Sequence, residues 1–410
     1  MTGPNSIRTY NPLPEGVDQA TIGVRGGLTR SGFEETAEAL FMSSGYVYPS
    51  ASVAEQSFTG EVDHYVYSRY GNPTVSMFQE RLRLIEGAPA AFATASGMAA
   101  VFVSLGALLG AGDRLVAARS LFGSCFVVCN EILPRWGVET VFVDGDDLEQ
   151  WERALSVPTQ AVFFETPSNP MQSLVDIAAV TELAHAAGAK VVLDNVFATP
   201  LLQQGFPLGV DVVVYSGTKH IDGQGRVLGG AILGDQEYID GPVQKLMRHT
   251  GPAMSAFNAW IMLKGLETLA VRVNHSNASA QRIAEFLEDH AAVRWVRYPF
   301  LPSHPQHDLA KRQMTGGGTV VTFELESGQN GREDTAKRRA FEVLDKLRLI
   351  DISNNLGDTK SLVTHPATTT HRAMGPEGRA AIGLGDGVVR ISVGLEGTDD
   401  LIADIDQALS

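Results

Sequence analysis

Short, continuously apolar runs alternate with helical patterns between residues 75 and about 260. Most of these runs are rich in β-branched residues and lack polar alternation, which is typical of strands buried on both faces. Strand–helix alternation over this length predicts a mostly parallel sheet with right-handed crossovers and with helices on both faces. The runs expected as strands are AAFATA, DRLVAA, VETVFVD, QAVFFET, AKVVLDN, DVVVYS and GGAILG.

The rest of the chain predicts two smaller parts. Residues 1–65 are polar and rich in Gly, Ser and Pro, so we expect an N-terminal arm that lies on another surface, such as a second subunit. Residues 66–265 would form the domain with the large sheet. Residues 266–410 begin with a helical pattern and contain the strand-like runs GTVVTFELE, LRLIDIS and VVRISVG, which predicts a smaller C-terminal domain. The expected class is therefore α/β, with a large, mostly parallel seven-stranded sheet.

Net charge and hydropathy narrow the classes of partner. The formal net charge is −15, which argues against nucleic acid and anionic membranes, because both bind positively charged surfaces. The chain has no apolar run long enough to span a bilayer and no apolar signal segment at its start. We therefore expect a cytoplasmic protein that acts on small molecules, without a membrane partner.

Cysteine and histidine usage predicts no metal site. Cys125 and Cys129 lie in one apolar segment, which indicates packed thiols in a reducing compartment rather than a disulfide. His220, His365 and His371 have no cysteine or carboxylate at ligand spacing, so we expect them to be packing or loop residues.

Polar residues follow several of the expected strands. In open α/β sheets, ligands bind beyond the carboxyl ends of the strands. Asp194 follows KVVL, Glu165 and Asn169 follow AVFF, and Ser216 to Lys219 follow DVVVY. These residues are therefore candidates for ligand binding.

Two segments are suited to phosphate. Gly97 and Met98 begin an apolar helix, where backbone N–H groups and the positive end of the helix dipole attract an anion. Ser96 could equally serve only as an ordinary cap of that helix. Ser216 and Thr218 supply two hydroxyls beside backbone amides, which can hold phosphate oxygens.

Lys219 stands directly after these hydroxyls. A lysine that is partly desolvated near other cations is more readily deprotonated and can form a Schiff base, whereas an ordinary loop lysine stays solvated. The G-x-x-x-x-G-K-[ST] pattern is lacking here, which argues against a nucleoside-triphosphate loop. Local sequence leaves the catalytic and the surface interpretation of Lys219 equally open. Asp194 is similarly ambiguous, because it could end a turn, cap a helix or pair with a protonated ring nitrogen.

Two arginines elsewhere could bind anionic groups. Arg69 lies beside Tyr67 in HYVYSRYGNPT and could hold phosphate through two hydrogen bonds. Arg390 lies in the apolar run VVRISVG, so a buried guanidinium there needs an anionic partner, either a substrate carboxylate or a structural one. Taken with the phosphate segments, Asp194 and Lys219, these residues suit pyridoxal phosphate chemistry on amino acids.

The order of the motifs is specific as well. From about Tyr65 to the end, the chain closely resembles the Cys/Met-metabolism family of pyridoxal-phosphate enzymes, of the aspartate-aminotransferase fold type. The motifs that carry the resemblance are YSRYGNPT, ASGMAA, FETPSNP, VVLDNVFATP, YSGTKHIDGQGR, LGDTKSLVTHPATTTH and VRISVGLE. The resemblance implies a homotetramer built from active dimers, because the family's site is shared between chains.

The resemblance also implies a role for each matching residue. Lys219 would carry pyridoxal 5'-phosphate covalently and act in catalysis, and Asp194 would keep the ring nitrogen protonated. Arg390 would bind the substrate α-carboxylate, with Asn355 and Tyr67 also in the substrate site. The other cofactor contacts would be Gly97, Met98, Ser216 and Thr218 at the phosphate, joined by Tyr67 and Arg69 from the neighbouring subunit, Asn169 near the ring oxygen and Phe122 on the ring.

One departure from the family pattern concerns the ring. Many relatives have a tyrosine in an LYG motif where this chain has Phe122 in SLFGSCF, so stacking is kept and a hydroxyl is lost. Ser124 stands where methionine γ-lyases tend to have a reactive cysteine, which argues against that activity.

The reaction that the resemblance implies is a γ-replacement in methionine biosynthesis. It would convert O-succinylhomoserine and sulfide to homocysteine and succinate. The alternatives are the activities of a cystathionine γ-synthase or an O-acetylhomoserine sulfhydrylase and, less readily, of a γ-lyase. In another class of answer, the chain would be a non-catalytic relative that keeps the fold for binding.

Overall fold

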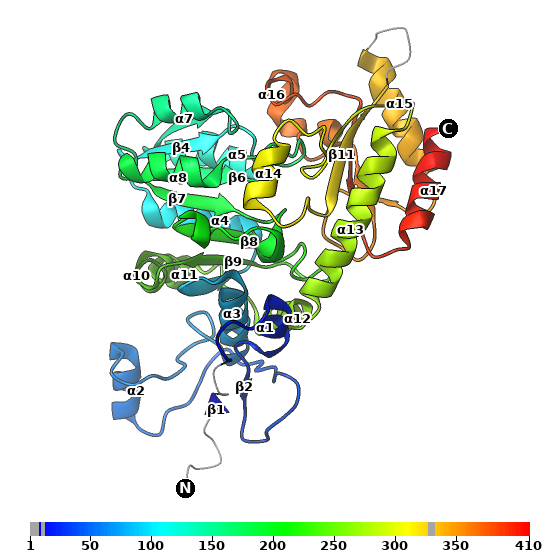
Figure 1. Cartoon of the computed structure of the whole chain (residues 1–410). Helices are drawn as coiled ribbons and strands as arrows, with labels where there is room; N and C mark the ends of the chain where they lie inside the picture. Colours follow the sequence, from blue (N-terminus) through cyan, green and yellow to red (C-terminus); the bar gives the residue numbers. More distant parts are fainter. Residues whose placement is uncertain (1–7, 10–12, 327–332) are drawn as a thin grey trace. The chain divides into compact units, whose positions relative to one another are not determined.

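The computed structural model describes residues 8–9, 13–326 and 333–410, and its large sheet contains all seven expected strands (Figure 1). The strand order is β3-β9-β8-β7-β6-β4-β5. Strands β4 and β5, β4 and β6, and β6 and β7 pair in parallel, whereas β3 and β9 pair antiparallel. The mostly parallel α/β fold is therefore confirmed. The strand bounds are β3 Ala90–Thr94, β4 Arg114–Ala118, β5 Glu139–Val143, β6 Ala161–Glu165, β7 Lys190–Asp194, β8 Val212–Ser216 and β9 Gly230–Gly234.

A second sheet of five strands follows the long helix α13, Leu269–Glu288. Its order is β10-β11-β14-β13-β12, with antiparallel pairs except for β12 and β13. The sequence run LRLIDIS contributes only the two residues of β12, and β10 and β13 were not expected. The strand bounds are β10 Val293–Arg297, β11 Val320–Leu325, β12 Asp351–Ile352, β13 Leu362–Thr364 and β14 Val388–Ser392.

Helices separate most of the strands, as the alternation predicts (Figure 1). The N-terminal arm contains two further helices that the sequence did not indicate, α1 Gln19–Arg25 and α2 Ala51–Thr59, and a strand pair, β1 Arg8–Thr9 with β2 Thr29–Arg30. The other α-helices of four or more residues are α3 Pro73–Glu86, α4 Gly97–Leu108, α5 Gly123–Val127, α7 Leu148–Ala154, α8 Ile177–Ala186, α9 Thr199–Leu202, α11 Gln244–Thr250, α12 Ala256–Leu266, α14 His307–Gln313, α15 Glu333–Lys346, α16 Gly375–Ala381 and α17 Thr398–Leu409.

The ends of α3 show why these residues form a helix. The Asn72 side chain accepts hydrogen bonds from the backbone N–H groups of Thr74 and Val75, which would otherwise lack a helical partner. Pro73 occupies the first turn, where a missing N–H costs nothing. Gly87 ends the helix at φ 76°, a left-handed conformation that residues with a Cβ rarely adopt.

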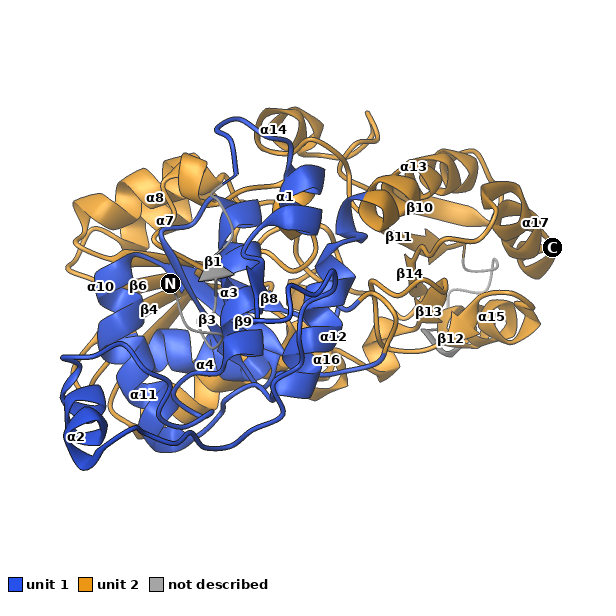
Figure 2. Cartoon of the chain, turned by 90° about the horizontal axis from the view of Figure 1, so that it is seen from below, with its two compact units in different colours: residues 1–107, 214–222, 226–270 blue, residues 108–213, 223–225, 271–410 orange. Residues whose placement is uncertain are grey.

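The described residues group into two compact units (Figure 2). Unit 1 comprises residues within 1–107, 214–222 and 226–270, and unit 2 comprises those within 108–213, 223–225 and 271–410. The division of the chain at residues 65 and 265 that the sequence suggests stays a prediction.

The second sheet, in unit 2, has one face that packs on helices α13, α15 and α17. Side chains alternate between the faces of a strand, so Val389 and Ile391 of β14 face this core together with Phe323 of β11. Arg390 therefore points to the other face of the sheet. This alternation is what directs a charged side chain away from the apolar core and into the candidate site.

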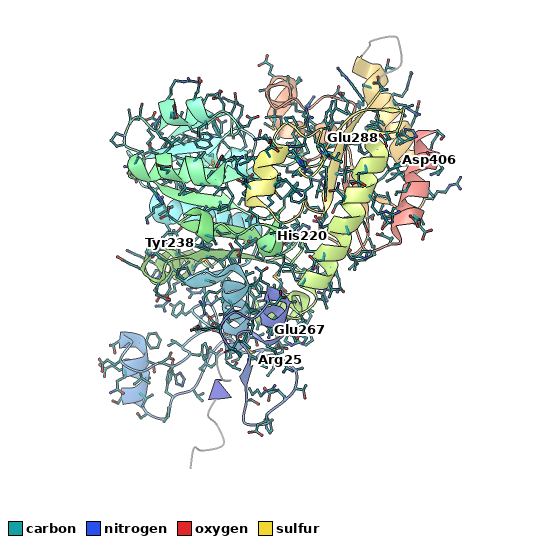
Figure 3. All side chains as sticks on the ribbon, viewed as in Figure 1. Arg25, His220, Tyr238, Glu267, Glu288 and Asp406 are labelled. Atoms are coloured by element: carbon teal, nitrogen blue, oxygen red, sulfur yellow. The ribbon has the colours of Figure 1, made fainter. Side chains whose placement is uncertain are left out.

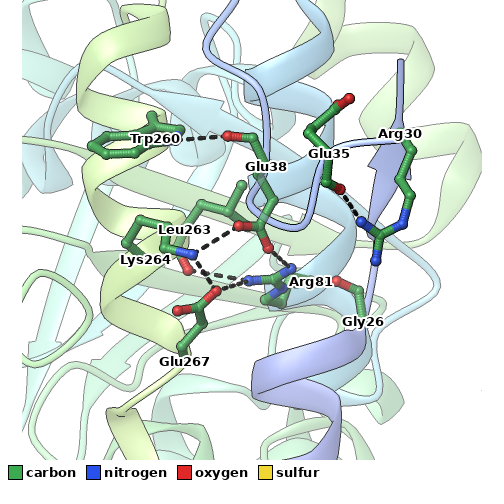
Figure 4. A network of polar contacts seen from close by, with 9 residues as sticks. All are labelled: Gly26, Arg30, Glu35, Glu38, Arg81, Trp260, Leu263, Lys264 and Glu267. Atoms are coloured by element: carbon green, nitrogen blue, oxygen red, sulfur yellow. Dashed lines mark hydrogen bonds and ion pairs between the residues drawn. The ribbon is translucent and has the colours of Figure 1, made fainter. Parts of the chain in front are cut away.

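A buried ion-pair network holds the arm within unit 1 (Figure 4). Arg81 of α3 is fully buried, and its guanidinium pairs with Glu38 of the arm at 2.5 Å. Lys264 of α12 pairs with Glu38 at 2.9 Å and also with Glu267. The arm thus lies against α3 and α12 of its own unit through the buried Arg81–Glu38 pair and the partly exposed Lys264.

Two further findings concern the surroundings of the chain. Cys125 and Cys129 are both buried thiols, as expected, and burial raises the pKa of Cys129 to about 12. Within the part of the chain that the structure describes, no helix combines the length and the apolar character needed to cross a membrane.

Candidate active site

Lys219 lies in unit 1, in a tight turn directly after strand β8. Residues 212–215 of the strand are buried, and the Tyr215 hydroxyl donates a hydrogen bond of 2.5 Å to the buried Glu86 carboxylate. The Lys219 N–H then bonds the Ser216 carbonyl at 3.2 Å, and the Asp222 N–H bonds the Gly217 carbonyl at 2.8 Å. The half-buried Lys219 side chain is therefore attached to a rigid part of the fold.

Ser216 and the start of helix α4 approach each other closely in unit 1. A Cβ at Gly97 would lie 2.6 Å from the Ser216 Cβ and 2.8 Å from its Oγ, which only glycine avoids. Ser96 does cap the helix, since its Oγ accepts from the Ala99 N–H at 3.1 Å. The first N–H groups of α4 and the Ser216 hydroxyl thus belong to one small region. This arrangement is suited to an anion, and a side chain at position 97 would fill it.

Thr218, Tyr67 and Arg69 are further candidate residues in unit 1. The Thr218 Oγ1 accepts a hydrogen bond of 3.2 Å from the Gly229 N–H. The Arg69 guanidinium carbon lies 5.3 Å from the centre of the Tyr67 ring, and the guanidinium donates to the Arg248 carbonyl. Tyr67 and Arg69 therefore lie side by side, as their spacing suggests, with Tyr67 43% exposed.

Asp194 and Glu165 form a pair of buried carboxyls in unit 2. They end the neighbouring parallel strands β7 and β6 and are directly aligned in the register, so their side chains leave the same face of the sheet. Burial raises the pKa of Asp194 to about 6, against the opposing effect of a hydrogen bond from the Val196 N–H. Burial and the charge of Asp194 raise the pKa of Glu165 well above its ordinary value. Such a pair accepts a nearby cation readily.

Glu165 also connects two backbone segments of unit 2. Its Oε2 accepts from the Phe122 N–H at 2.9 Å, and its Oε1 accepts from the Asn169 N–H at 2.9 Å. Phe122 is the half-buried residue that precedes helix α5, and Asn169 is 4% exposed. The carboxyl of one strand end thus holds two of the residues predicted to contact the cofactor.

Arg390 lies against Asn169 in the same unit. Its Nη1 donates to Asn169 Oδ1 at 3.0 Å, and its Nη2 donates to the Asn354 and Asn355 carbonyls at 3.1 Å. The side chain is 1% exposed, and its Nε has no hydrogen-bond partner among the described residues. Burial lowers the pKa of Arg390 to about 10, and the Glu165 charge opposes this shift. A fully buried guanidinium with a donor to spare is suited to a carboxylate ligand.

His220, which is labelled in Figure 3, His365 and His371 are all buried side chains, and His220 directly follows Lys219 in the sequence. His371 Nε2 lies 3.0 Å from the Asn169 carbonyl, and burial lowers the pKa of His371 to about 4. Among the described residues, no group of three or more His, Cys, Asp or Glu side chains could hold a metal ion. A separate cavity of about 680 Å³ in unit 1, between the arm and α3, is lined by none of the candidate residues.

The residues fit pyridoxal phosphate. Asp194 is a buried carboxyl that suits a protonated ring nitrogen, and the glycine at position 97 leaves room for a phosphate beside Ser216. The sequence indicated both, and it named Glu165 only as a strand-end candidate for ligand binding, without a specific role. The register that pairs Glu165 with Asp194 follows from two adjacent parallel strands.

Comparison with known proteins gives the family. The sequence model of the family of Cys/Met metabolism PLP-dependent enzymes matches residues 20–410. The chain is 87% identical over 410 residues, all of both chains, to O-succinylhomoserine sulfhydrylase of Mycobacterium tuberculosis. It is 46% identical to O-succinylhomoserine sulfhydrylase of Pseudomonas aeruginosa over 97% of this chain and 96% of that one.

A solved structure from Campylobacter jejuni that carries an N'-pyridoxyl-lysine-5'-monophosphate superimposes with a TM-score of 0.90. That protein is 30% identical, and the match covers 96% of this chain and 100% of that chain. The fold, the strand-end residues and the full-length similarity agree with one another. The chain belongs to the Cys/Met metabolism family of pyridoxal-phosphate-dependent enzymes.

Proposed function

We propose that this protein is an O-succinylhomoserine sulfhydrylase, which converts O-succinylhomoserine and sulfide to homocysteine and succinate in methionine biosynthesis. The observation that carries the proposal is the full-length identity of 87% to a sulfhydrylase of that specificity. The buried Arg390 guanidinium supports it, because an α-amino acid substrate brings the carboxylate that this side chain suits.

Pyridoxal phosphate would supply an electron sink for the electron pairs left on the substrate when Cα and Cβ lose their protons, before succinate leaves from Cγ. Lys219 is the residue that binds the cofactor covalently, and its Nζ then moves protons to and from the substrate carbons. Asp194, with its pKa near 6, is ionised at neutral pH and holds a proton on the ring nitrogen. The overall change breaks the Cγ–O bond and forms a Cγ–S bond, with no net oxidation or reduction.

The remaining roles are proposed from the resemblance to the family, and the geometry of each unit supports some of them. The hydroxyls of Ser216 and Thr218 and the N–H groups of Gly97 and Met98 bind the phosphate, supported by the close approach at Gly97. Phe122 would hold the cofactor ring by stacking, and Asn169 would contact its ring oxygen. The substrate contacts are Arg390, Asn355 and Tyr67, and Arg69 contacts the phosphate together with Tyr67.

The active assembly is a homotetramer built from dimers, in which Tyr67 and Arg69 serve the site of the neighbouring subunit. Large apolar side chains of the arm support this part of the proposal. They are unusually exposed: Phe33 by 93%, Val47 by 90%, Met42 by 72% and Phe58 by 69%. Size-exclusion chromatography with light scattering measures the mass of the assembly, and the mass of a monomer would contradict the proposed tetramer.

We place the protein in the cytoplasm. The two buried thiols Cys125 and Cys129 support this, since they suit a reducing compartment. Small-molecule substrates are its partners, and the charge of −15 supports the absence of a nucleic-acid or membrane partner.

The residue assignment is tested by the change Lys219→Ala. The expected variant keeps the fold, loses the yellow imine absorbance that borohydride removes, and loses turnover by several orders of magnitude. Substantial activity in the variant would contradict the assignment. Absence of the imine band from the unchanged protein would instead indicate a non-catalytic relative.

A further inference from the structure

Glu165 is a buried carboxyl that the proposed mechanism does not use. It is 4% exposed at the end of β6, and it is aligned in the register with Asp194 of β7. A second carboxyl beside one that must stay ionised is costly, because like charges in a buried place oppose each other. Such a residue needs a compensating role in the structure or in the site.

The hydrogen bonds of Glu165 offset the cost of burying this carboxyl. The two carboxylate oxygens accept one backbone N–H each, from Phe122 and from Asn169, and both distances are 2.9 Å. These donors belong to different segments, the turn before α5 and the loop after β6. Both oxygens are therefore engaged in holding backbone that carries predicted cofactor contacts.

The same loop reaches the substrate side of unit 2. Asn169 accepts from Arg390 Nη1 at 3.0 Å through its side chain, and its carbonyl lies 3.0 Å from His371 Nε2. A displacement of Asn169 would therefore change the surroundings of the Arg390 guanidinium. Glu165 is thus linked directly to Phe122, the predicted contact of the cofactor ring. Through Asn169 it is also linked to Arg390, the predicted contact of the substrate carboxylate.

We propose that Glu165 is a positioning residue for the cofactor, which holds the Phe122 and Asn169 backbones in place beside Asp194. The inference rests on the proposed function of these neighbours. Phe122 would then be held in position to contact the cofactor ring, and Asn169 would keep its hydrogen bond with Arg390. Glu165 itself makes no contact with substrate and moves no proton in the reaction.

Two substitutions separate positioning from charge. Glu165→Gln keeps the shape but has only one acceptor oxygen, so one backbone N–H faces an amide N–H instead. Glu165→Asp keeps the charge but withdraws the carboxylate from both donors by about one carbon–carbon bond. A positioning role predicts that both changes weaken cofactor binding, by about tenfold or more, in line with the loss of a hydrogen bond to a charged acceptor.

Asp404→Asn provides a matched control in the same unit. Asp404 is 5% exposed, and its carboxylate accepts from the backbone N–H groups of Arg348 and Leu349 at 2.9 Å. It ties α17 to the segment before β12 and contacts none of the candidate site residues. A loss of stability alone should appear in this variant as well as in the Glu165 variants.

The experiment compares the unchanged protein with the three variants. It measures the dissociation constant of pyridoxal phosphate from the cofactor-free protein, the visible circular dichroism of the bound cofactor, and kcat and KM for O-succinylhomoserine. Both Glu165 variants should bind the cofactor about tenfold or more weakly and show a changed dichroic band, while Asp404→Asn keeps both values. The KM should rise together with the change in the band, because Asn169 adjoins Arg390.

Several results would overturn the inference. Unchanged cofactor affinity and dichroism in Glu165→Asp, with a change in Glu165→Gln alone, would show a purely electrostatic role. Equal changes in Asp404→Asn would show a general effect of stability. If Glu165→Gln does not fold, Glu165→Asp decides by the same measurements. Failure of the unchanged protein to bind the cofactor would contradict the proposed function instead.

Discussion

The Arg390 Nη1 lies 3.0 Å from the Asn169 Oδ1, and both side chains are almost completely buried in unit 2. The neutral Asn169 amide accepts one hydrogen bond from the Arg390 guanidinium without neutralising its charge. A buried cation that keeps its charge in this way is ready for an anionic ligand. The pair therefore links a structural contact to substrate recognition.

Arg390→Lys should raise the KM for O-succinylhomoserine about 10- to 100-fold, with a smaller effect on kcat. Lysine keeps the charge but loses the planar fork that binds a carboxylate through two hydrogen bonds. Steady-state kinetics checks this, with Arg294→Lys on the same sheet as the control, because the Arg294 side chain is 60% exposed. An unchanged KM in Arg390→Lys would remove Arg390 from the substrate site.

Gly97→Ala should weaken binding of pyridoxal phosphate at least tenfold, because the new Cβ would meet the Ser216 backbone and side chain at 2.6–2.9 Å. Gly106→Ala in the same helix is the control, since its Cβ meets only Leu246 at an ordinary 3.7 Å. That change should stabilise the protein by up to about 1 kcal/mol through helix propensity and leave cofactor binding unaltered. Equal cofactor affinities in the two variants would contradict the phosphate assignment.

Asp194→Asn tests the pKa of about 6 in the cofactor-free protein. An unfolded aspartate has a pKa of about 3.9, so between pH 4 and 6 the native state binds the proton more tightly. The stability that this carboxyl contributes is therefore present below pH 4 and is lost as pH rises to about 6.

Urea unfolding of the cofactor-free proteins measures the effect. Relative to the unchanged protein, the unfolding free energy of Asp194→Asn should increase by about 2–3 kcal/mol from pH 4 to pH 7. The same variant should lose cofactor affinity, because the ring nitrogen loses its charged partner. A difference in unfolding free energy that does not change with pH would show that Asp194 titrates normally.

Glu38→Gln should destabilise the protein by about 3 kcal/mol, because it leaves the fully buried Arg81 with only the more distant Glu267 carboxylate, at 3.8 Å. Burial alone would raise the pKa of Glu38, but the hydrogen bonds from Lys264 and Arg81 outweigh it and lower that pKa. This stabilisation is therefore present above the unfolded pKa and is lost as pH falls through the lowered one.

Thermal unfolding at pH 7 and pH 4 checks the prediction, with Glu80→Gln as the control. Glu80 pairs with Arg83 at 2.7 Å, but its side chain is 44% exposed, so its loss should cost less than about 1 kcal/mol. Similar costs for the two changes would mean that the buried network does not hold the arm.

The large sheet could be predicted because its strands are buried on both faces and therefore read as continuous apolar runs. Strand β10 could not, since Arg294 and Arg297 interrupt its run VRWVR and only Val296 of its five residues is buried. The arm helices α1 and α2 are equally hard to foresee, because each is short, and short helices are marginally stable in water without tertiary contacts.

The candidate site was predictable where a residue type is unusual for its place, such as Lys219 after a buried strand or Arg390 within one. The role of Glu165 could not be predicted, because it depends on Phe122 and Asn169 donating hydrogen bonds to the same side chain. Contacts of that kind arise from the register of β6 beside β7 and from loop conformation. Local sequence patterns do not contain that information.

The proposed activity is tested most directly by steady-state kinetics of the purified holoenzyme with O-succinylhomoserine and O-acetylhomoserine, each with sulfide and with cysteine. Homocysteine and succinate should form fastest from O-succinylhomoserine and sulfide, with kcat/KM at least tenfold above the other three pairs. A higher kcat/KM with cysteine, with cystathionine as the product, or with the acetyl ester would contradict the account.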